Sequence, residues 1–235
     1  LVYVRNPQFY CAGTIISDRH ILTAAHCLMD IRRGNSVQVI LDMDENYGYG
    51  DNDGVRVFST KFWMHENFSM PLAMFDIGII ELPLAINEYV NSTRKVRPIG
   101  ISTETDVDFD HLDNEVVLAG WGHVQRYYPA ENTQFANMKL INLTECMKYQ
   151  GHYIETITKD HICTEKIKGM PCDGDSGSGI ISLKTNKLIG LLSYVKDAEE
   201  GVDMGYNDCK SNIPAVSTRV ASYLDWISSK TGLDF

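Results

Sequence analysis

The chain has 235 residues, 44% of them hydrophobic, and a formal net charge of -10 at pH 7. An acidic protein is not attracted to nucleic acid or to anionic membrane surfaces, and no apolar run approaches the length of a membrane span. We therefore expect a soluble globular protein with neither of these partners. The length suits one large all-β unit or two fused halves.

The first strands are predicted at residues 1–5 and 9–17, on either side of an Asn6-Pro7-Gln8 turn. A further apolar run leads into Leu22-Thr23-Ala24-Ala25-His26-Cys27. Imidazole is the usual general base near neutral pH. His26 is therefore the first candidate for chemistry.

Residues 37–62 alternate apolar and polar side chains and predict two strands, separated by an acidic loop at residues 42–54. Clustered carboxylates could hold Ca²⁺, which prefers oxygen ligands. The loop resembles an EF-hand only loosely, however, so a solvated acidic hairpin is the better interpretation. No metal site is predicted.

The next candidate is the carboxylate of Asp76, which stands at the mouth of the apolar run at residues 75–82. A buried carboxylate at such a place is costly unless it is hydrogen-bonded. The N–H of an imidazole is a suitable donor, so Asp76 is predicted to orient His26.

Ser176 lies in a glycine-rich turn, Pro171-Cys172-Asp173-Gly174-Asp175-Ser176-Gly177-Ser178-Gly179. A serine hydroxyl is a poor nucleophile until a neighbouring base takes its proton. Because Gly174 has no side chain, its backbone N–H can converge with that of Ser176 on one point, which would form an oxyanion hole. With His26 and Asp76, Ser176 completes a Ser/His/Asp set in the chain order His, Asp, Ser.

Cysteines and glycosylation sequons indicate a location outside the cytosol. The six cysteines are an even set, and Asn-x-Ser/Thr sequons occur at Asn67, Asn91 and Asn142. We therefore expect a secreted, extracellular glycoprotein with disulfide bonds. Asn142 also precedes a capping-box pattern and is predicted to cap a helix; the two roles do not exclude each other.

Six short motifs together identify a family. The chain resembles the chymotrypsin-like (trypsin-like) serine endopeptidases over nearly its whole length, in the motifs Thr23-Ala24-Ala25-His26-Cys27, Asp76-Ile77-Gly78-Ile79-Ile80, Gly120-Trp121-Gly122, Gly174-Asp175-Ser176-Gly177, Ser193-Tyr194 and Thr218-Arg219-Val220. Each motif alone is weak, but all six in this order are specific.

The resemblance implies an all-β fold of two six-stranded antiparallel barrels with a C-terminal α-helix. The N-terminal barrel, residues 1–104, would carry His26 and Asp76. The C-terminal barrel, residues 105–221, would carry Ser176, and residues 222–235 would form the helix. The active site would then lie in the crevice between the barrels of one peptidase domain.

The resemblance also implies disulfides and a mechanism. The expected disulfides are Cys11–Cys27, Cys146–Cys163 and Cys172–Cys209. His26 would deprotonate Ser176 as it attacks the peptide carbonyl and then protonate the leaving amine, while Asp76 holds the imidazole. Water would hydrolyse the acyl-enzyme, and no cofactor is needed.

Four positions match substrate-binding positions of the family: Met170, Ser193, Val195 and Ala215. Met170 stands at the floor of the primary specificity pocket, where an Asp would select Arg or Lys. Val195 and Ala215 replace the usual wall glycines and narrow the pocket, while Ser193 carries the hydroxyl that holds the Asp76 carboxylate in relatives. We therefore expect a preference for small or medium apolar residues before the scissile bond.

An acidic insertion at residues 196–208 precedes Cys209 and would border the subsites upstream of the scissile bond. It could favour basic groups in the substrate or recruit a partner by charge. A solvated loop without selectivity is an equally good interpretation.

Relatives begin their active chain with Ile/Val-Val-Gly-Gly, and the freed ammonium pairs with the carboxylate before the nucleophile, here Asp175. That opening is absent from these residues, so we expect a short N-terminal piece to precede Leu1. The chain is then either a zymogen, an unactivated precursor, or an active chain whose first residues are not part of this sequence. The expected partners are protein or peptide substrates, protease inhibitors and an activating protease, and the protein is expected to be a monomer. The alternative is a catalytically silent or zymogen-state homologue that acts as a binding or regulatory protein.

Overall fold

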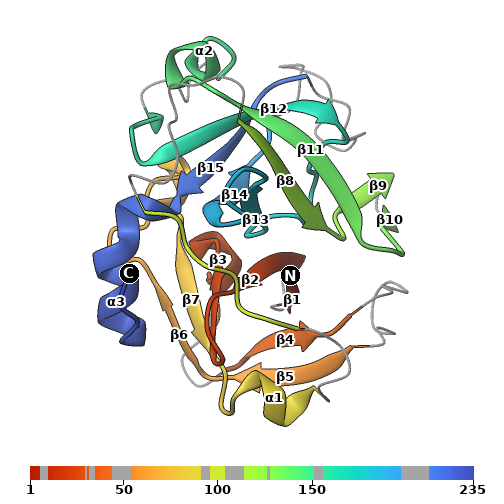
Figure 1. The fold of residues 1–235 in the computed structure, drawn as a ribbon, viewed down its shortest axis with the longest axis vertical. Coiled ribbons are helices and arrows are strands. Elements are labelled where there is room, and N and C mark those ends of the chain that lie inside the picture. The colour runs from red at the N-terminus through yellow and green to blue at the C-terminus, as the bar shows by residue number, and fades with distance from the viewer. Residues whose placement is uncertain are drawn as a thin grey trace.

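The computed structural model describes residues 1–5, 10–29, 31, 35–43, 54–90, 96–103, 114–125, 128–150, 156–196 and 212–235. These residues form two β-rich halves with a helix at the C-terminal end (Figure 1). The predicted domain boundary near Glu104 lies outside the described residues. The all-β, chymotrypsin-like fold class is confirmed by the solved structures reported below.

The first half is an antiparallel sheet with the strand order β5-β4-β1-β2-β3-β7-β6. Its strands are β1 (Val2–Arg5), β2 (Tyr10–Ile15), β3 (His20–Thr23), β4 (Val37–Leu41), β5 (Val55–Ser59), β6 (Lys61–Met64) and β7 (Gly78–Glu81). The half was predicted as a six-stranded barrel, whereas the sheet has seven strands. The difference arises at Thr60, where one extended segment bends so that β5 pairs with β4 and β6 pairs with β7.

Strand β7 is buried on both faces, which explains its continuous apolar sequence. Ile80 points into the core of the first half with Val39 and Leu82. Ile79 belongs to a second cluster that includes Leu191 of the other half. The strand that follows Asp76 therefore lies between the core of its own half and the junction of the two halves.

The second half is a closed barrel with the strand order β11-β12-β15-β14-β13-β8, as predicted for this half. Its strands are β8 (Glu115–Gly120), β11 (Gln134–Ile141), β12 (His161–Lys168), β13 (Gly179–Ser182), β14 (Leu188–Tyr194) and β15 (Ala215–Arg219), and a separate ribbon is formed by β9 (His123–Gln125) and β10 (Tyr128–Pro129). Alternate residues of β11, among them Met138 and Leu140, fill the barrel. This is the period-two pattern of a strand with one face in the core.

The helical segments are short: η1 (Ala25–Leu28), η2 (Met70–Leu72), α1 (Ile86–Tyr89), α2 (Leu143–Met147), η4 (Val220–Tyr223) and α3 (Leu224–Thr231). Asn142 caps α2, as predicted, by accepting a hydrogen bond from the Glu145 N–H at 2.7 Å. Helix α3 ends at Gly232 in the left-handed conformation, so it is shorter than the predicted helix at residues 222–235. No helix among the described residues is long and apolar enough to cross a membrane.

The C-terminal helix joins the two halves. In Figure 1 it lies beside β6 and β7 of the first half, although it follows the last strand of the second. Tyr223 and Ile227 are buried in one cluster with Ile77 and Ile79, and Trp226 packs against this cluster. The helix therefore holds the first half against the end of the second.

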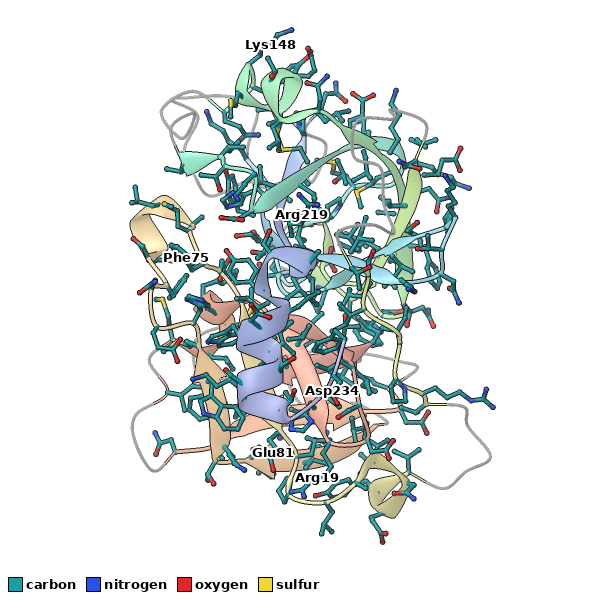
Figure 2. The ribbon with its side chains drawn as sticks, turned by 60° about the vertical axis from the view of Figure 1, so that its left-hand side comes forward. Arg19, Phe75, Glu81, Lys148, Arg219 and Asp234 are labelled. Atoms are coloured by element: carbon teal, nitrogen blue, oxygen red, sulfur yellow. A yellow bond between two sulfur atoms is a disulfide. The ribbon has the colours of Figure 1, made fainter. Side chains whose placement is uncertain are left out.

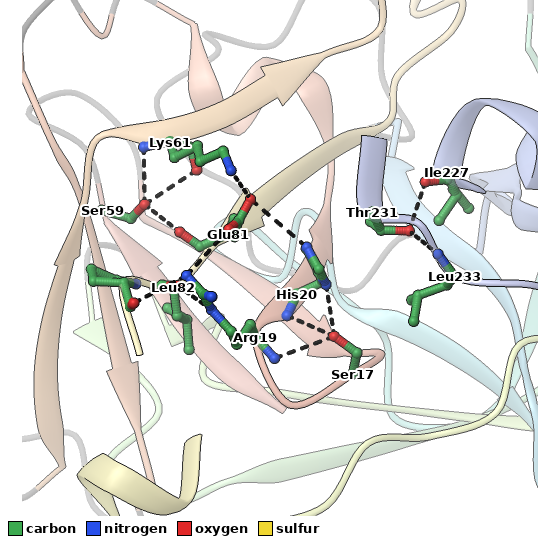
Figure 3. A network of polar contacts seen from close by, with 11 residues as sticks. Ser17, Arg19, His20, Ser59, Lys61, Glu81, Leu82, Ile227, Thr231 and Leu233 are labelled. Atoms are coloured by element: carbon green, nitrogen blue, oxygen red, sulfur yellow. Dashed lines mark hydrogen bonds and ion pairs between the residues drawn. The ribbon is translucent and has the colours of Figure 1, made fainter. Parts of the chain in front are cut away.

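A polar network fixes the other end of β7. The Glu81 carboxylate forms ion pairs with the Arg19 guanidinium at 3.2 Å and the Lys61 ammonium at 2.5 Å (Figure 3). The Nε2 atom of His20 lies 3.9 Å from the same carboxylate. The Ser59 hydroxyl donates to the Glu81 carbonyl at 2.6 Å. These contacts connect β3, β5 and β6 to β7 at the end opposite Asp76.

Candidate active site

The turn that carries His26 is held by packing and by a disulfide. Ala24 and Ala25 are fully buried, so only small side chains fit before the histidine. Cys11 and Cys27 form a disulfide, the pair that the resemblance implied. Their sulfur atoms lie near His26, but sulfurs joined to each other are not available as thiolate metal ligands. The turn is therefore a rigid support for an imidazole.

Asp76 contacts His26 through both carboxylate oxygens. Oδ2 lies 2.8 Å from His26 Nδ1, and Oδ1 accepts the His26 backbone N–H at 2.9 Å. The Ser193 hydroxyl donates to the same Oδ2 at 2.6 Å, and the Thr218 hydroxyl donates to the Asp76 carbonyl at 2.8 Å. Since Asp76 is only 2% exposed, these bonds offset the cost of burying its charge.

The two groups shift each other's protonation. Burial disfavours the imidazolium, but the charge and hydrogen bond of Asp76 outweigh it and raise the pKa of His26. Burial likewise disfavours the carboxylate, yet the charge of His26 and the hydrogen bonds from His26 and Ser193 lower the pKa of Asp76. The pair thus keeps Asp76 ionised and makes His26 a stronger base than free imidazole.

Ser176 lies at the seam between the two halves. Its carbonyl accepts the Ala12 N–H of β2 at 2.8 Å, and the next residue, Gly177, donates its N–H to the Leu192 carbonyl of β14 at 2.8 Å. Gly177 has φ +80°, and a Cβ there would overlap Thr23 Oγ1. Ser176 is therefore brought against the turn that carries His26, with the Cys27 Sγ 3.7 Å from its carbonyl oxygen.

Asp175 is buried behind the nucleophile turn. Its carboxylate accepts the backbone N–H of Gly122 at 2.8 Å and that of Cys172 at 2.9 Å. Burial nevertheless raises the pKa of Asp175 to about 6, since these two bonds only partly compensate the loss of water. A Cβ at Gly120 or Gly122 would overlap the carboxylate, which explains the two glycines of the Gly120-Trp121-Gly122 motif.

The two predicted oxyanion-hole donors are available. Gly174 adopts φ +94°, a conformation that favours glycine, in a turn closed by the Asp175 N–H and the Cys172 carbonyl at 3.0 Å. Neither the Gly174 N–H nor the Ser176 N–H donates to any group of the described residues. A pocket of about 340 Å³, open to solvent, adjoins this turn and is lined by Tyr3, Tyr10, Trp121, His123, Pro129, Asp173 and Gly174.

The predicted substrate-binding positions lie at the same end of the second half. Ala215 is fully buried in the barrel core, and Val195 packs against that core. Met170 is partly buried. The Ser193 hydroxyl is engaged by Asp76, so it holds the carboxylate rather than facing a ligand.

Other predicted positions are described only in part. Cys146 and Cys163 form the expected disulfide, and Cys172 is disulfide-bonded, while its expected partner Cys209 lies outside the described residues. Asn67 and Asn142 are exposed. Asn91, most of the acidic loop (residues 44–53) and the insertion from residue 197 also lie outside the described residues.

Two contacts were not predicted from the sequence. Thr218 belongs to one of the family motifs, but its bond to the Asp76 carbonyl follows only from the fold. His65 packs between aromatic rings, with its ring centroid 4.9 Å from that of Phe75 and 5.2 Å from that of Trp226. Its partners are distant in sequence or on another element, so no local pattern indicated them.

Comparison with known proteins places the chain among the serine peptidases that its sequence motifs resemble. The model of the trypsin family matches residues 1–227. A collagenase of Hypoderma lineatum is 28% identical over 97% of this chain and 78% of its own length. A trypsin of Tyrophagus putrescentiae, Tyr p 3.0101, is 31% identical over 96% of this chain and 73% of its own length.

Solved structures agree on the fold. A collagenase structure with 27% identity has a TM-score of 0.78 and covers 100% of this chain and 94% of its own. A scabies mite inactivated protease paralogue has a TM-score of 0.79 at 18% identity, which shows the fold alone. The fold and the His26–Asp76–Ser193 arrangement define a protein of the chymotrypsin-like serine peptidase class. By the match over residues 1–227, this chain belongs to the trypsin family and is a serine endopeptidase.

Proposed function

We propose that Ser176, His26 and Asp76 carry out peptide-bond hydrolysis through an acyl-enzyme. His26 Nε2 takes the Ser176 hydroxyl proton as Oγ bonds to the carbonyl carbon, and the same nitrogen then protonates the amine as the C–N bond breaks. Water attacks the resulting ester with His26 again acting as base, and Ser176 is released with its proton restored. No step requires a cofactor.

The observation that carries the proposal is the set of contacts around Asp76. Its Oδ2 accepts from both His26 Nδ1 and Ser193 Oγ, which fixes the imidazole with Nδ1 protonated and leaves Nε2 as the base. In this proposal Asp76 stabilises the imidazolium that forms when Ser176 is deprotonated. The structure supports it further because the Ser176 backbone is anchored to β2, beside the His26 turn.

We further propose that Gly174 and Ser176 supply the oxyanion hole. Their N–H groups have no acceptor among the described residues, so a developing oxyanion would give both a partner. Removal of one such donor commonly costs about 3 kcal/mol of transition-state stabilisation. Gly174 would contribute its backbone N–H to the oxyanion hole, and its positive φ favours glycine at this position.

We propose a preference for small or medium apolar residues before the scissile bond. Met170 offers no carboxylate to an Arg or Lys side chain, and Val195 and Ala215 occupy space that glycines would leave open. The test is a peptide-library cleavage profile. We expect cleavage after Ala, Val and Leu, whereas preferential cleavage after Arg or Lys would contradict the proposal.

The decisive experiment for catalysis is labelling with a fluorophosphonate probe, which reacts with an activated serine. The intact protein should be labelled, and Ser176→Ala should not. Ser178→Ala is the matched control, because this buried serine is two residues away and its hydroxyl has no hydrogen-bond partner among the described residues. Labelling that persists in Ser176→Ala would refute the assignment.

One observation favours a second candidate, a zymogen state. Asp175 is neutralised by no cationic group of the described residues, and burial raises its pKa to about 6. A folded protein that is not labelled, but becomes labelled after limited proteolysis, would be a precursor. A folded protein that resists labelling after every such treatment would be a silent homologue. The disulfides Cys11–Cys27 and Cys146–Cys163 and the exposed sequon residues Asn67 and Asn142 are consistent with our proposal of a secreted protein.

A further inference from the structure

The loop that leads into Asp76, residues 69–75, has an unusual backbone. Ala73 has φ +47° and Phe75 has φ +54°, both in the left-handed region although neither is glycine. Each such residue costs on the order of 1 kcal/mol. Figure 2 labels Phe75 on this Asp76 loop, near the junction of the two halves. Contacts from elsewhere must hold the loop in place.

Two of these contacts come from neighbouring strands of the second half. His161 of β12 and Thr218 of β15 are directly paired in the antiparallel register, so their side chains leave the barrel together. His161 Nε2 lies 3.4 Å from the Ala73 carbonyl oxygen. Thr218 Oγ1 donates to the Asp76 carbonyl at 2.8 Å. The pair therefore holds both ends of the segment from Ala73 to Asp76.

The surroundings of His161 determine its tautomer. Nδ1 lies 3.2 Å from the Thr158 backbone N–H, which donates to it, so the ring proton is on Nε2 and can be donated to Ala73. The side chain is nearly fully buried. Burial lowers the pKa of His161, although its hydrogen bonds and the charges of Asp160 and Asp76 oppose this effect. The neutral imidazole is thus the form that makes both contacts.

We propose that His161 is a positioning residue: its Nε2–H holds the Ala73 carbonyl, and so keeps the strained Asp76 loop in the conformation that places the Asp76 carboxylate on His26. The inference rests on the proposed function of Asp76. His161 does not touch the substrate. Its effect passes through three backbone residues to a carboxylate whose position decides the orientation of the general base.

The kinetic consequence is specific. Misplacing Asp76 weakens support of the imidazolium in the transition state but leaves the substrate contacts intact. For His161→Phe we expect kcat to fall about tenfold, with KM within about twofold of the wild-type value. His161→Gln, whose amide can still donate to Ala73, should retain most of kcat. His20→Gln is the control, because His20 is half-buried but contacts Ser17 and Glu81 at the other end of the half.

A rescue variant separates positioning from general stability. Glycine adopts the left-handed conformation without penalty, so Ala73→Gly should make the loop less dependent on His161. Alone it should change kcat by less than about twofold, but in the His161→Phe background it should recover several-fold of the lost kcat. Equal effects of Ala73→Gly in both backgrounds would overturn the proposal.

A readout independent of turnover completes the test. The pKa of His26, followed by NMR, is raised by Asp76 in the wild type, so it should fall towards 6.5 in His161→Phe and stay unchanged in His20→Gln. If His161→Phe does not fold, Thr218→Val removes the other contact and should lower the His26 pKa in the same direction. An unchanged His26 pKa in a folded variant refutes the positioning role. If the wild type resists the fluorophosphonate probe both before and after limited proteolysis, the proposed function fails, and the NMR result still decides this inference.

Discussion

Replacing Asp175 with Asn tests whether burial of this carboxylate, without a cationic partner among the described residues, makes its ionisation destabilise the fold. In the folded chain the carboxylate has a pKa of about 6, compared with an ordinary value of 3.8. Between these two values the folded protein binds more protons at this site than the unfolded chain does. Asp175 therefore lowers the free energy of unfolding progressively as pH rises from about 4 to 6, and the penalty is complete above that range.

The magnitude follows from the two pKa values. The difference between 3.8 and about 6 corresponds to about 3 kcal/mol at neutral pH, with each pKa unit worth 1.36 kcal/mol. Asn carries no titrating group, so Asp175→Asn lacks this pH-dependent penalty. One of the N–H groups of Gly122 and Cys172 will face the Asn amide instead of an oxygen, which adds a cost that does not vary with pH.

The assay is urea denaturation of the chain of residues 1–235 and its Asp175→Asn variant at several pH values between 4 and 8. The free energy of unfolding of the wild type is subtracted from that of the variant at each pH. This difference removes the pH dependence contributed by other carboxylates, such as Asp76, whose lowered pKa makes the fold more stable as pH rises. Part of the penalty is already present at pH 4, so the variant should gain about 2.5 kcal/mol relative to the wild type as pH rises across this range. A constant difference would refute the argument from burial. If the wild type instead becomes more stable than the variant as pH rises, a cation, such as a freed terminal ammonium, pairs with Asp175.

Three further predictions concern the supports of the site. Gly122→Ala should destabilise the fold by about 2 kcal/mol in urea denaturation, because the added Cβ overlaps the Asp175 carboxylate; a fully stable variant would contradict this packing. Glu81→Gln should destabilise the fold by about 1 kcal/mol at pH 7, because the ion pairs with Lys61 and Arg19 are lost. This difference should shrink as pH falls below 4.5, the ordinary value for Glu, since the pKa of Glu81 is lowered and its carboxylate is protonated in the folded protein only below that value. Asn142→Ala should lose about 1 kcal/mol through the missing helix cap, measured by thermal unfolding, whereas Asn142→Ser should lose little.

Much of the architecture could be predicted from the sequence because it depends on local patterns. The alternation in residues 37–62 indicated β4 and β5. The glycine-rich sequence around Ser176 indicated a turn, although the positive φ of Gly174 and Gly177 is known only from the structure. The third strand of that stretch, β6, was not predicted, because Lys61 and Met64 are exposed and the pattern fades there. Its place in the sheet depends on pairing with β7, which the fold supplies.

The positions of His26 and Asp76 could be predicted from sequence, but the way they are held could not. The contact between His161 and Ala73 spans 88 residues, and that between Thr218 and Asp76 spans 142. Neither leaves a periodic signal in the chain. The left-handed conformation of Phe75 is also hidden, since a bulky side chain is uncommon at positive φ and nothing in the sequence marks it.

The contacts of Asp76 link assembly of the site to docking of the two halves. Among the described residues of its own half, the carboxylate accepts hydrogen bonds only from the two N–H groups of His26. From the other half, Ser193 of β14 donates to the carboxylate and Thr218 of β15 donates to the Asp76 backbone carbonyl. Asp76 is 2% exposed with both halves in place, and burial of a charge with too few donors costs several kcal/mol. An undocked first half would therefore expose Asp76 to water, and water would compete for His26. The contacts between the two halves thus stabilise the His26–Asp76 pair, and the same packing of the halves brings the Ser176 backbone to β2.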